Sequence, residues 1–448
     1  MLKPFAIKSD HIVTPHGVMA GAVWIAADGT IADITRCSDL PRELARVDAE
    51  GLWVLPGVVD THVHINEPGR TDWEGFATAT HAAAAGGVTT MVDMPLNCIP
   101  VTTTASALAT KLEAIRGHLW VDCGFFGGVV PGNSSELGAL EKAGVLGFKA
   151  FMADSGIPEF PALSPRDLMT AMPLIARLGV PLLAHAELEG AVAPSDFASD
   201  DYRSYLASRP KSWENAAIRI LITEAGRTRC AVHVVHLSSA EALPLLAEAR
   251  LGGVPITVET CPHYLTLTAE DIARGDTRFK CAPPIRESAN REALWQGLSS
   301  GAIDCVVSDH SPCTPELKGL VAGDFQKAWG GISSLQLSLS LVWTEAKLRG
   351  FDLTDVARWL SSQPARLVGI SDRKGRIASG LDADLVLFDP GASWTVVPEG
   401  IFHRHKITPY AGRTLTGRVA ATYLRGRKIF ADGAFGEGPH GAFILRGT

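Results

Sequence analysis

The sequence predicts an α/β fold, a (β/α)8 TIM-like barrel that carries a small β-sandwich domain formed by both chain termini. Two observations lead to this prediction. Eight short apolar runs alternate with helical stretches rich in Ala, Leu and Glu between residues 55 and 370, and eight β–α units are what such a barrel needs. Short strand-like runs broken by Gly, Asp and Pro fill the two ends, 1–54 and 371–448. Because each end is short for an independently stable domain, we expect the two ends to form one small β domain, with the barrel inserted between them in the sequence.

The strands of the predicted barrel follow from its apolar runs. In chain order these are VVDTHVHI, VTTMVDMP, VDCGFFGGVV, VLGFKAFM, VPLLAHAEL, CAVHVVHLSS, VPITVETCPHYL and AIDCVVSDHS. The segments between them, such as SALATKLEAIRG and AAIRILITEAGR, have helical periodicity, and several finish with a glycine stop signal. In the N-terminal β region, Asp28-Gly29 marks a hairpin turn.

Composition narrows the class of protein. The 448 residues carry 41 Lys and Arg against 48 Asp and Glu, a formal net charge of -7, which does not favour a nucleic-acid partner. The eight cysteines include no CxxC pair, so we expect free, reduced thiols. The N-terminus lacks the pattern of a signal peptide, and no apolar stretch approaches the roughly 18 residues of a membrane span. We therefore expect a cytoplasmic protein with no membrane partner.

Polar residues stand at the C-terminal edges of the apolar runs, where barrel enzymes place their catalytic groups. The strand period of two puts His62 and His64 on one face, from which both imidazoles can bind one metal ion. The other runs that carry such a residue contribute Lys149, His185, His236 and Asp309. The combined pattern predicts a metal site at one end of the barrel.

Each of these residues also has a structural interpretation when it is taken alone. A single His at a strand end is usually a hydrogen-bonded structural residue, and Asp309 is suited to cap the segment that follows it. Lys149 is harder to explain in this way, because burying an unpaired ammonium among phenylalanines costs free energy and lowers its pKa. The neutral amine can form a carbamate with carbon dioxide, whose two oxygens can bridge two cations.

The segment PGVVDTHVHINEPGRTDWEGFATATHAAAAGGVTTMVDMPLN, residues 56–97, resembles the signature of the cyclic amidohydrolases. This group includes dihydroorotases, hydantoinases, dihydropyrimidinases and allantoinases. The motifs GFKAFMADSG, ETCPHYLT, KCAPPIR, SDHSPCTPELK and KAWGGISSLQ are most similar to those of the allantoinase branch. The resemblance covers nearly the whole chain, including the split β domain.

The resemblance implies a centre of two divalent metal ions per chain. By position, His62 and His64 match the ligands of one ion, and His185 and His236 match those of the other. Lys149 matches the carboxylated lysine that bridges them, and Asp309 matches a ligand that is also the general base. The metal in this group is usually zinc, with manganese, cobalt, nickel or iron as alternatives. Such a centre activates a water molecule that opens a cyclic amide, and the resemblance also implies a homotetramer.

Two departures from related groups favour a cyclic ureide, allantoin, as the substrate, with allantoate as the product. Dihydroorotases usually hold the substrate carboxylate with an Arg where this chain has Asn66, and a bidentate Arg is the natural carboxylate receptor. Hydantoinases typically carry a Tyr shortly after the bridging lysine, and no Tyr follows Lys149 here. The residues expected to line the substrate pocket are Asn97, Ser311 and the backbone around Ala282 and Gly331. Asn97 and Ser311 also have simpler interpretations, as a turn residue and a helix cap.

Alternatives to this function remain open at this stage. One alternative is the same chemistry on another ring, as in a hydantoinase, a dihydropyrimidinase or a dihydroorotase, and the other is a catalytically silent scaffold. We expect His81 and His263 to be structural and His310 to orient neighbouring groups. The polar segment 196–215 is interpreted either as a mobile lid or as a solvated loop.

Overall fold

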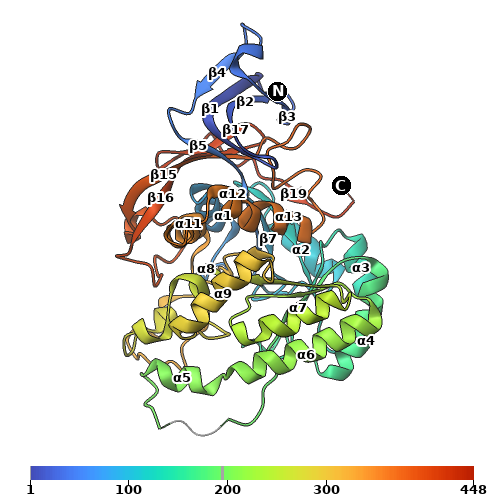
Figure 1. Cartoon of the computed structure of the whole chain (residues 1–448). Coiled ribbons are helices and arrows are strands. Elements are labelled where there is room, and N and C mark those ends of the chain that lie inside the picture. Colours follow the sequence, from blue (N-terminus) through green and yellow to red (C-terminus); the bar gives the residue numbers. More distant parts are fainter. Residues whose placement is uncertain (1, 193–195, 448) are drawn as a thin grey trace.

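The structure is a computed structural model that describes residues 2–192 and 196–447. Strands from the two ends of the chain lie side by side at the top of Figure 1, and the helices and parallel strands of the middle of the chain lie below them. No helix among the described residues is long and apolar enough to cross a membrane.

A nine-stranded sheet joins the two chain ends in the order β18-β17-β16-β15-β5-β1-β2-β3, with β4 paired to β1. The join is antiparallel, between β5 and β15, where Leu385 lies opposite Pro56. The N-terminal strands are β1 (Phe5–Thr14), β2 (Gly17–Ile25), β3 (Ile31–Thr35), β4 (Ala45–Asp48) and β5 (Trp53–Pro56). The C-terminal strands of this sheet are β15 (Leu385–Thr395), β16 (Thr414–Leu424), β17 (Arg427–Ala431) and β18 (Ala434–Phe435). The predicted association of the two chain ends is therefore present as strand pairing.

The eight apolar runs of the central region all contain strands, and every pairing observed between these strands is parallel. They are β6 (Val58–Val63), β7 (Val88–Asp93), β8 (Asp122–Phe125) with β9 (Gly127–Gly128), β10 (Phe148–Phe151), β11 (Leu182–His185), β12 (Val232–Val234), β13 (Ile256–Thr260) and β14 (Cys305–Val306). One sheet has the order β14-β13-β12-β11-β10-β9, and the other has the order β19-β8-β7-β6, with β19 at Phe443–Ile444.

The two parallel sheets are connected at two places. Only Phe126 separates β8 in one sheet from β9 in the other. At the second place, a parallel bridge joins Val63 at the end of the edge strand β6 to His310, which follows the edge strand β14. The carboxyl ends of the eight strands consequently face the same region, which is where the polar residues lie.

Helices follow the strands, and the two stretches quoted above for their helical periodicity, SALATKLEAIRG and AAIRILITEAGR, are helical over most of their length. The helices that connect the parallel strands are α1 (Phe76–Ala85), α2 (Ala105–Ala114), α3 (Leu137–Lys142), α4 (Pro165–Leu178), α5 (Tyr202–Ser208), α6 (Lys211–Thr228), α7 (Leu243–Leu251), α8 (Pro262–Thr266) and α9 (Ser288–Ser300). Those after β14 are α10 (Pro315–Lys318), α11 (Ser338–Leu348), α12 (Leu353–Ala357) and α13 (Gln363–Leu367).

Helix α4 shows how local sequence sets these boundaries. Ser164 and Asp167 form a capping box, and Pro165 occupies the first helical position, where the missing N–H costs nothing. Gly179 ends the helix with a φ of 67°, a left-handed conformation that glycine adopts without a side-chain clash. The chain then turns directly into β11, whose last residue is His185.

Candidate metal centre and substrate cavity

The six predicted metal-binding residues lie in or just after five of the parallel strands, toward their carboxyl ends. They are His62 in β6, His64 one residue after it, Lys149 in β10, His185 at the end of β11, His236 after β12 and Asp309 after β14. All six are buried. His236 and Asp309 have φ values of 40° and 45°, a left-handed conformation that residues with a Cβ rarely adopt. Such backbone strain is concentrated at functional sites.

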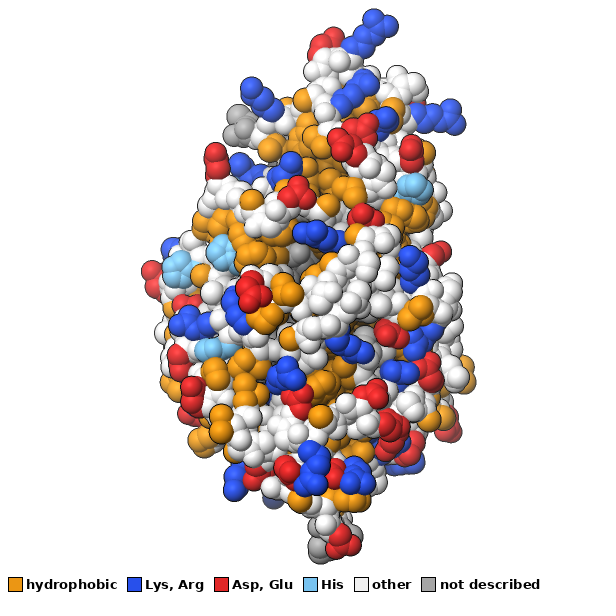
Figure 2. Space-filling view, turned by 90° about the vertical axis from the view of Figure 1, so that its left-hand side faces the viewer, with side chains coloured by type: hydrophobic (Ala, Val, Ile, Leu, Met, Phe, Trp, Pro, Cys, Tyr) orange, Lys and Arg blue, Asp and Glu red, His pale blue; other side chains and the backbone are white. Residues whose placement is uncertain are grey.

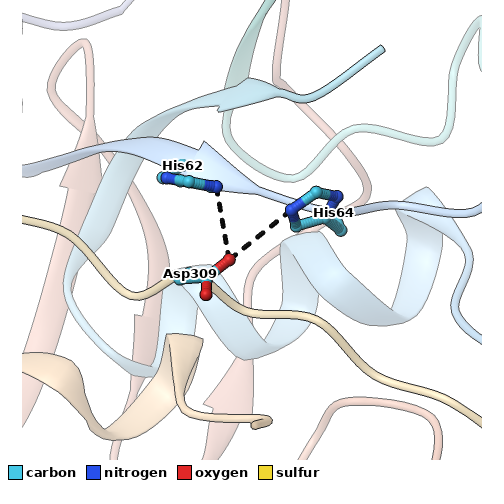
Figure 3. A group of neighbouring side chains, drawn as sticks. All are labelled: His62, His64 and Asp309. Carbon is cyan, nitrogen blue, oxygen red and sulfur yellow. Dashed lines mark ion pairs between the residues drawn. The ribbon is translucent and has the colours of Figure 1, made fainter. Parts of the chain in front are cut away.

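His62, His64 and Asp309 form one compact group, and their side chains point toward one another in Figure 3. The Oδ1 atom of Asp309 lies 3.3 Å from Nε2 of His62 and 3.5 Å from Nε2 of His64. This set offers two ring nitrogens and one carboxylate oxygen to a single cation.

His185 and His236 form a second group beside the first. Nδ1 of His185 and Nε2 of His236 are 3.0 Å apart, and the ring centroids of His62 and His236 are 5.4 Å apart. Burial, reinforced by the charge of Lys149, lowers the pKa of both His62 and His236 well below the ordinary value. Their rings are therefore neutral near pH 7, which leaves nitrogen lone pairs free to bind a metal.

Lys149 is fully buried, and its Nζ has no hydrogen-bond partner among the described residues. The ammonium group lies 4.9 Å from the ring centroid of Phe151. Burial lowers the pKa of Lys149 to about 8, although the charges of Glu259 and Asp309 oppose the shift. Burial thus favours the neutral amine, the form that carbamate formation requires.

Glu259 contacts the ring nitrogen of His62 that faces away from Asp309, and it was not predicted from the sequence. One of its carboxylate oxygens contacts Nδ1 of His62, and the other lies 3.0 Å from Nε2 of His233. Nδ1 of His233 is in turn 2.7 Å from the hydroxyl of Thr257. A carboxylate on the second ring nitrogen fixes the tautomer of a metal-binding histidine. The signal in the sequence was an acidic residue inside the otherwise apolar run VPITVETCPHYL.

Glu187 has the corresponding position beside His185, and it was also missed. Its carboxylate lies 2.8 Å from Nε2 of His185 and pairs with the guanidinium of Arg209. Burial alone would raise the pKa of Glu187, but the bonds to His185 and Arg209 outweigh it and lower the pKa to about 2. The ring of Phe151 stacks on His185 at a centroid distance of 4.7 Å. The spacing of two residues from His185 to Glu187 was the available signal.

All four predicted substrate residues line a small cavity over these groups. The cavity has a volume of about 80 Å³, and Asn97, Ala282, Ser311 and Gly331 are in its wall together with His64, His185, His236 and Asp309. Asp154, Ser155, Trp329 and Gly330 also line it, and the sequence analysis did not select them. The geometry thus brings the candidate metal ligands and the candidate substrate residues to one place.

Three further histidines were considered in the sequence. His81 stacks against Trp120 and Phe435, away from the cavity, which is a structural role as expected. Nδ1 of His310 accepts the N–H of Ser334 at 3.2 Å, and its Nε2 lies 3.7 Å from Glu74.

His263 was expected to be structural, and it lies beside the candidate metal centre. It is fully buried, and a ring nitrogen, the thiol of Cys261 and the carboxylate of Asp309 lie within 4.8 Å of one another. Burial lowers the pKa of His263 to about 4. A neutral imidazole therefore lies beside Asp309.

The segment 196–215, interpreted as a mobile lid or a solvated loop, contains α5 and the first turn of α6. The hydroxyls of the buried Tyr202 and Tyr205 donate to the carbonyls of Ile285 at 3.1 Å and Cys281 at 2.8 Å. A lid motion here would move a folded helix and break these two buried bonds.

Comparison with known proteins places the chain in a family. The family model described as "Amidohydrolase family" matches residues 53–429. The chain belongs to the amidohydrolase family. Among curated relatives, this amidohydrolase is 50% identical to an allantoinase of Streptomyces avermitilis over 442 residues, which cover 98% of each chain. It is 45% identical to an allantoinase of Saccharomyces cerevisiae, with 95% of each chain covered. Its fold matches the solved structure titled L-hydantoinase (dihydropyrimidinase) from Arthrobacter aurescens with a TM-score of 0.93, at 31% identity and covering 99% and 100% of the two chains.

Proposed function

We propose that this amidohydrolase hydrolyses the cyclic amide bond of the hydantoin ring of allantoin and releases allantoate. The observation that carries the proposal is the 50% identity to an allantoinase along 98% of both chains. The solved hydantoinase shares the fold at a lower identity of 31%. A complete set of six polar residues at the carboxyl ends of the strands supports an active enzyme rather than a silent scaffold.

We further propose that the site holds two divalent metal ions, which we expect to be zinc. The donor set fits: His62, His64 and Asp309 offer one group of ligands, and His185 and His236 offer another. Lys149, buried and unpartnered, is proposed to be carboxylated and to bridge the two ions. When bound, such ions lower the pKa of water and polarise a carbonyl oxygen.

Asp309 is proposed as the general base and acid of the reaction. Its carboxylate is buried and lines the cavity, where it would be within reach of the attacking water and of the ring. As the water oxygen adds to the ring carbonyl carbon, Asp309 takes the proton that is released. It returns that proton to the ring nitrogen as the C–N bond breaks. The ring opens to a carboxylic acid and a neutral ureido N–H, and the acid then releases the second proton of the water to solvent to give the carboxylate, so that charge and protons balance.

The cavity wall supports a neutral ureide over a carboxylated ring. No Lys or Arg lines this cavity among the described residues, so the carboxylate of dihydroorotate has no cationic receptor there. Asn66 lies outside the lining, and its amide nitrogen is 3.4 Å from the carbonyl of Pro312. Asn97, Asp154 and Ser311 are proposed to bind the N–H and carbonyl groups of the ureido tail. Hydantoin, which lacks the tail, is the main alternative substrate.

For the architecture, we propose that the eight parallel strands close into a (β/α)8 barrel comprising residues 55–370. The pairing of Val63 with His310 and the continuity of β8 with β9 support closure. Residues 1–54 and 371–448 are proposed to form the small β domain, and the pairing of β5 with β15 supports this division.

We propose a cytoplasmic homotetramer whose partner is a small cyclic ureide. The eight cysteines are all free thiols, which supports a reducing compartment. Figure 2 shows Lys and Arg interspersed with Asp and Glu over one face, with hydrophobic patches between them in its upper half. Mixed charge supports a small-molecule substrate over a polyanion, and the apolar patches support contacts between copies of the chain. Light scattering of the purified protein tests the tetramer.

The experiment that tests the function is a substrate panel on protein reconstituted with zinc. Ring opening of allantoin, hydantoin, dihydrouracil and dihydroorotate is followed for the wild type and for Asp309→Asn. We expect allantoin to have the highest kcat/KM, and we expect the variant to lose turnover by about 10²–10⁴-fold. Preference for another ring would replace the substrate, and an active Asp309→Asn would remove the assigned base.

A further inference from the structure

Two buried lysines lie behind one wall of the substrate cavity. Lys318, the last residue of α10, is 3% exposed, and Lys280 is 8% exposed. Within the described part of the chain neither forms an ion pair with a carboxylate, and burial lowers the pKa of each to about 8. Burying two ammonium groups without a counter-ion is costly, so the contacts that they make require an explanation.

The ammonium of Lys318 binds three main-chain carbonyls that belong to the wall or adjoin it. It donates to the carbonyl of Lys280 at 2.9 Å and that of Trp329 at 3.2 Å, and it also contacts that of Gly331. Trp329 and Gly331 line the cavity. All three donors of the ammonium are thus used, and they join the segment around residue 280 to residues 329–331.

Lys280 extends the same arrangement. Its ammonium donates to the carbonyl of Gln326 at 3.1 Å and to that of Ala328 at 2.5 Å, and it lies 5.0 Å from the ring centroid of Tyr205. The N–H of Gly331 donates to the carbonyl of Lys280 at 2.9 Å. The two ammonium groups together therefore bind four main-chain carbonyls of residues 326–331.

The direction of the peptide groups links these contacts to the substrate. In a trans peptide the C=O and the following N–H point in opposite directions. Because the carbonyl of Trp329 points to Lys318, the N–H of Gly330 points away from it, and that N–H has no acceptor among the described residues. The wall is also tight: Gly331 has a φ of 146°, and a Cβ there would lie 2.3 Å from the carbonyl oxygen of Ser311.

We propose that Lys318, assisted by Lys280, is a positioning residue that orients the main chain of residues 329–331 and thereby sets the affinity of the cavity for the cyclic amide. This inference rests on the proposed function, since it assumes that the cavity binds the ring that is opened. Lys318 touches neither the metal ligands nor the substrate. Its removal should change binding of the ring more than the chemical step.

The test compares Lys318→Met with the wild type as zinc-loaded protein, by the KM and kcat for allantoin and by metal content. We expect KM to rise by about tenfold or more, the effect of losing hydrogen bonds to a charged group. The kcat should stay within about threefold, and two metal ions per chain should be retained. Lys327→Met is the matched control, because Lys327 lies on the same loop with its side chain 86% exposed.

Two further results decide the proposal. An unchanged KM for Lys318→Met would overturn it, as would a parallel loss of kcat and bound metal, which would indicate a general structural role. If Lys318→Met does not fold, the same measurement on Lys280→Met tests the proposal. We expect a smaller rise in KM of about threefold. An unchanged KM in this variant would overturn the proposal. If the wild type opens hydantoin and not allantoin, the proposed function fails, and the same comparison of KM on hydantoin still tests the lysines.

Discussion

Two cavities at opposite ends of the parallel strands differ in size and in chemistry. The cavity at the carboxyl ends holds about 80 Å³, whereas one at the amino ends holds about 940 Å³. The larger cavity is lined by residues that start strands, among them Val232, Ile256 and Cys305. Volume alone would select the wrong end of the molecule.

The difference lies in how the polar side chains are partnered. Around the larger cavity, His233 is bonded to Thr257, Asp304 pairs with Arg250, and Arg373 pairs with Asp382. Beside the smaller cavity, Nζ of Lys149 and Nδ1 of His236 have no hydrogen-bond partner among the described residues. Buried nitrogens are normally satisfied, so these two, on side chains of the candidate metal centre, are available to bind a ligand. The comparison teaches that buried polar atoms without hydrogen-bond partners are a better guide to the candidate site than the volume of a cavity.

The largest effect is expected at the carboxyl end, from Lys149→Ala. Without the proposed bridging carbamate, the protein should retain fewer than two metal ions per chain, and kcat/KM should fall by about 10²–10⁴-fold. Metal analysis after dialysis and initial rates on allantoin measure both. Lys142→Ala, at an exposed lysine at the end of α3, is the control. Full metal content and activity in Lys149→Ala would show that this buried lysine is structural.

A smaller effect at the same end is expected from the two supporting carboxylates. Glu259→Gln and Glu187→Gln should each weaken metal binding by about 10–100-fold, because each removes the charged partner of one histidine. Since Glu259 contacts His62 and Glu187 contacts His185, each variant should weaken a different ion. Stepwise titration against a metal-binding dye separates the two affinities. If both variants lowered the same affinity, the two groups would not be separate sites.

The candidate metal ligands were more predictable from the sequence than the carboxylates that contact them. His62 and His64 show a strand period of two at the end of an apolar run, and a pattern of this kind is local. Glu259 supports His62 from 197 positions away, and a contact over that distance depends on strand order, which no local pattern contains. The eight strands were predicted because their runs are continuous and apolar. Helices α11–α13 follow the last strand and were not assigned, because the alternation of apolar runs and helical stretches ends at the eighth run.

Lys318 and Lys280 show the same limit. Lys318 belongs to the motif SDHSPCTPELK, which was quoted for its resemblance, but no role was assigned to it. Its partners are carbonyl groups, which every residue carries, so no side-chain pattern marks them. Only the folded positions of Lys280, Trp329 and Gly331 reveal the contact.

The smallest effect is expected at the amino ends of the strands, from Arg366→Ala. Arg366 lines the larger cavity and is exposed, so its loss removes surface charge without leaving a buried group unpaired. We expect kcat/KM for allantoin and the metal content to stay within about twofold, and stability to change by less than about 0.5 kcal/mol. Thermal unfolding and initial rates check this. A rise in KM for allantoin would mean that a change at the larger cavity alters binding at the smaller one. The contacts from His233 to Glu259 and from Glu259 to His62 would then be the physical connection between the two cavities.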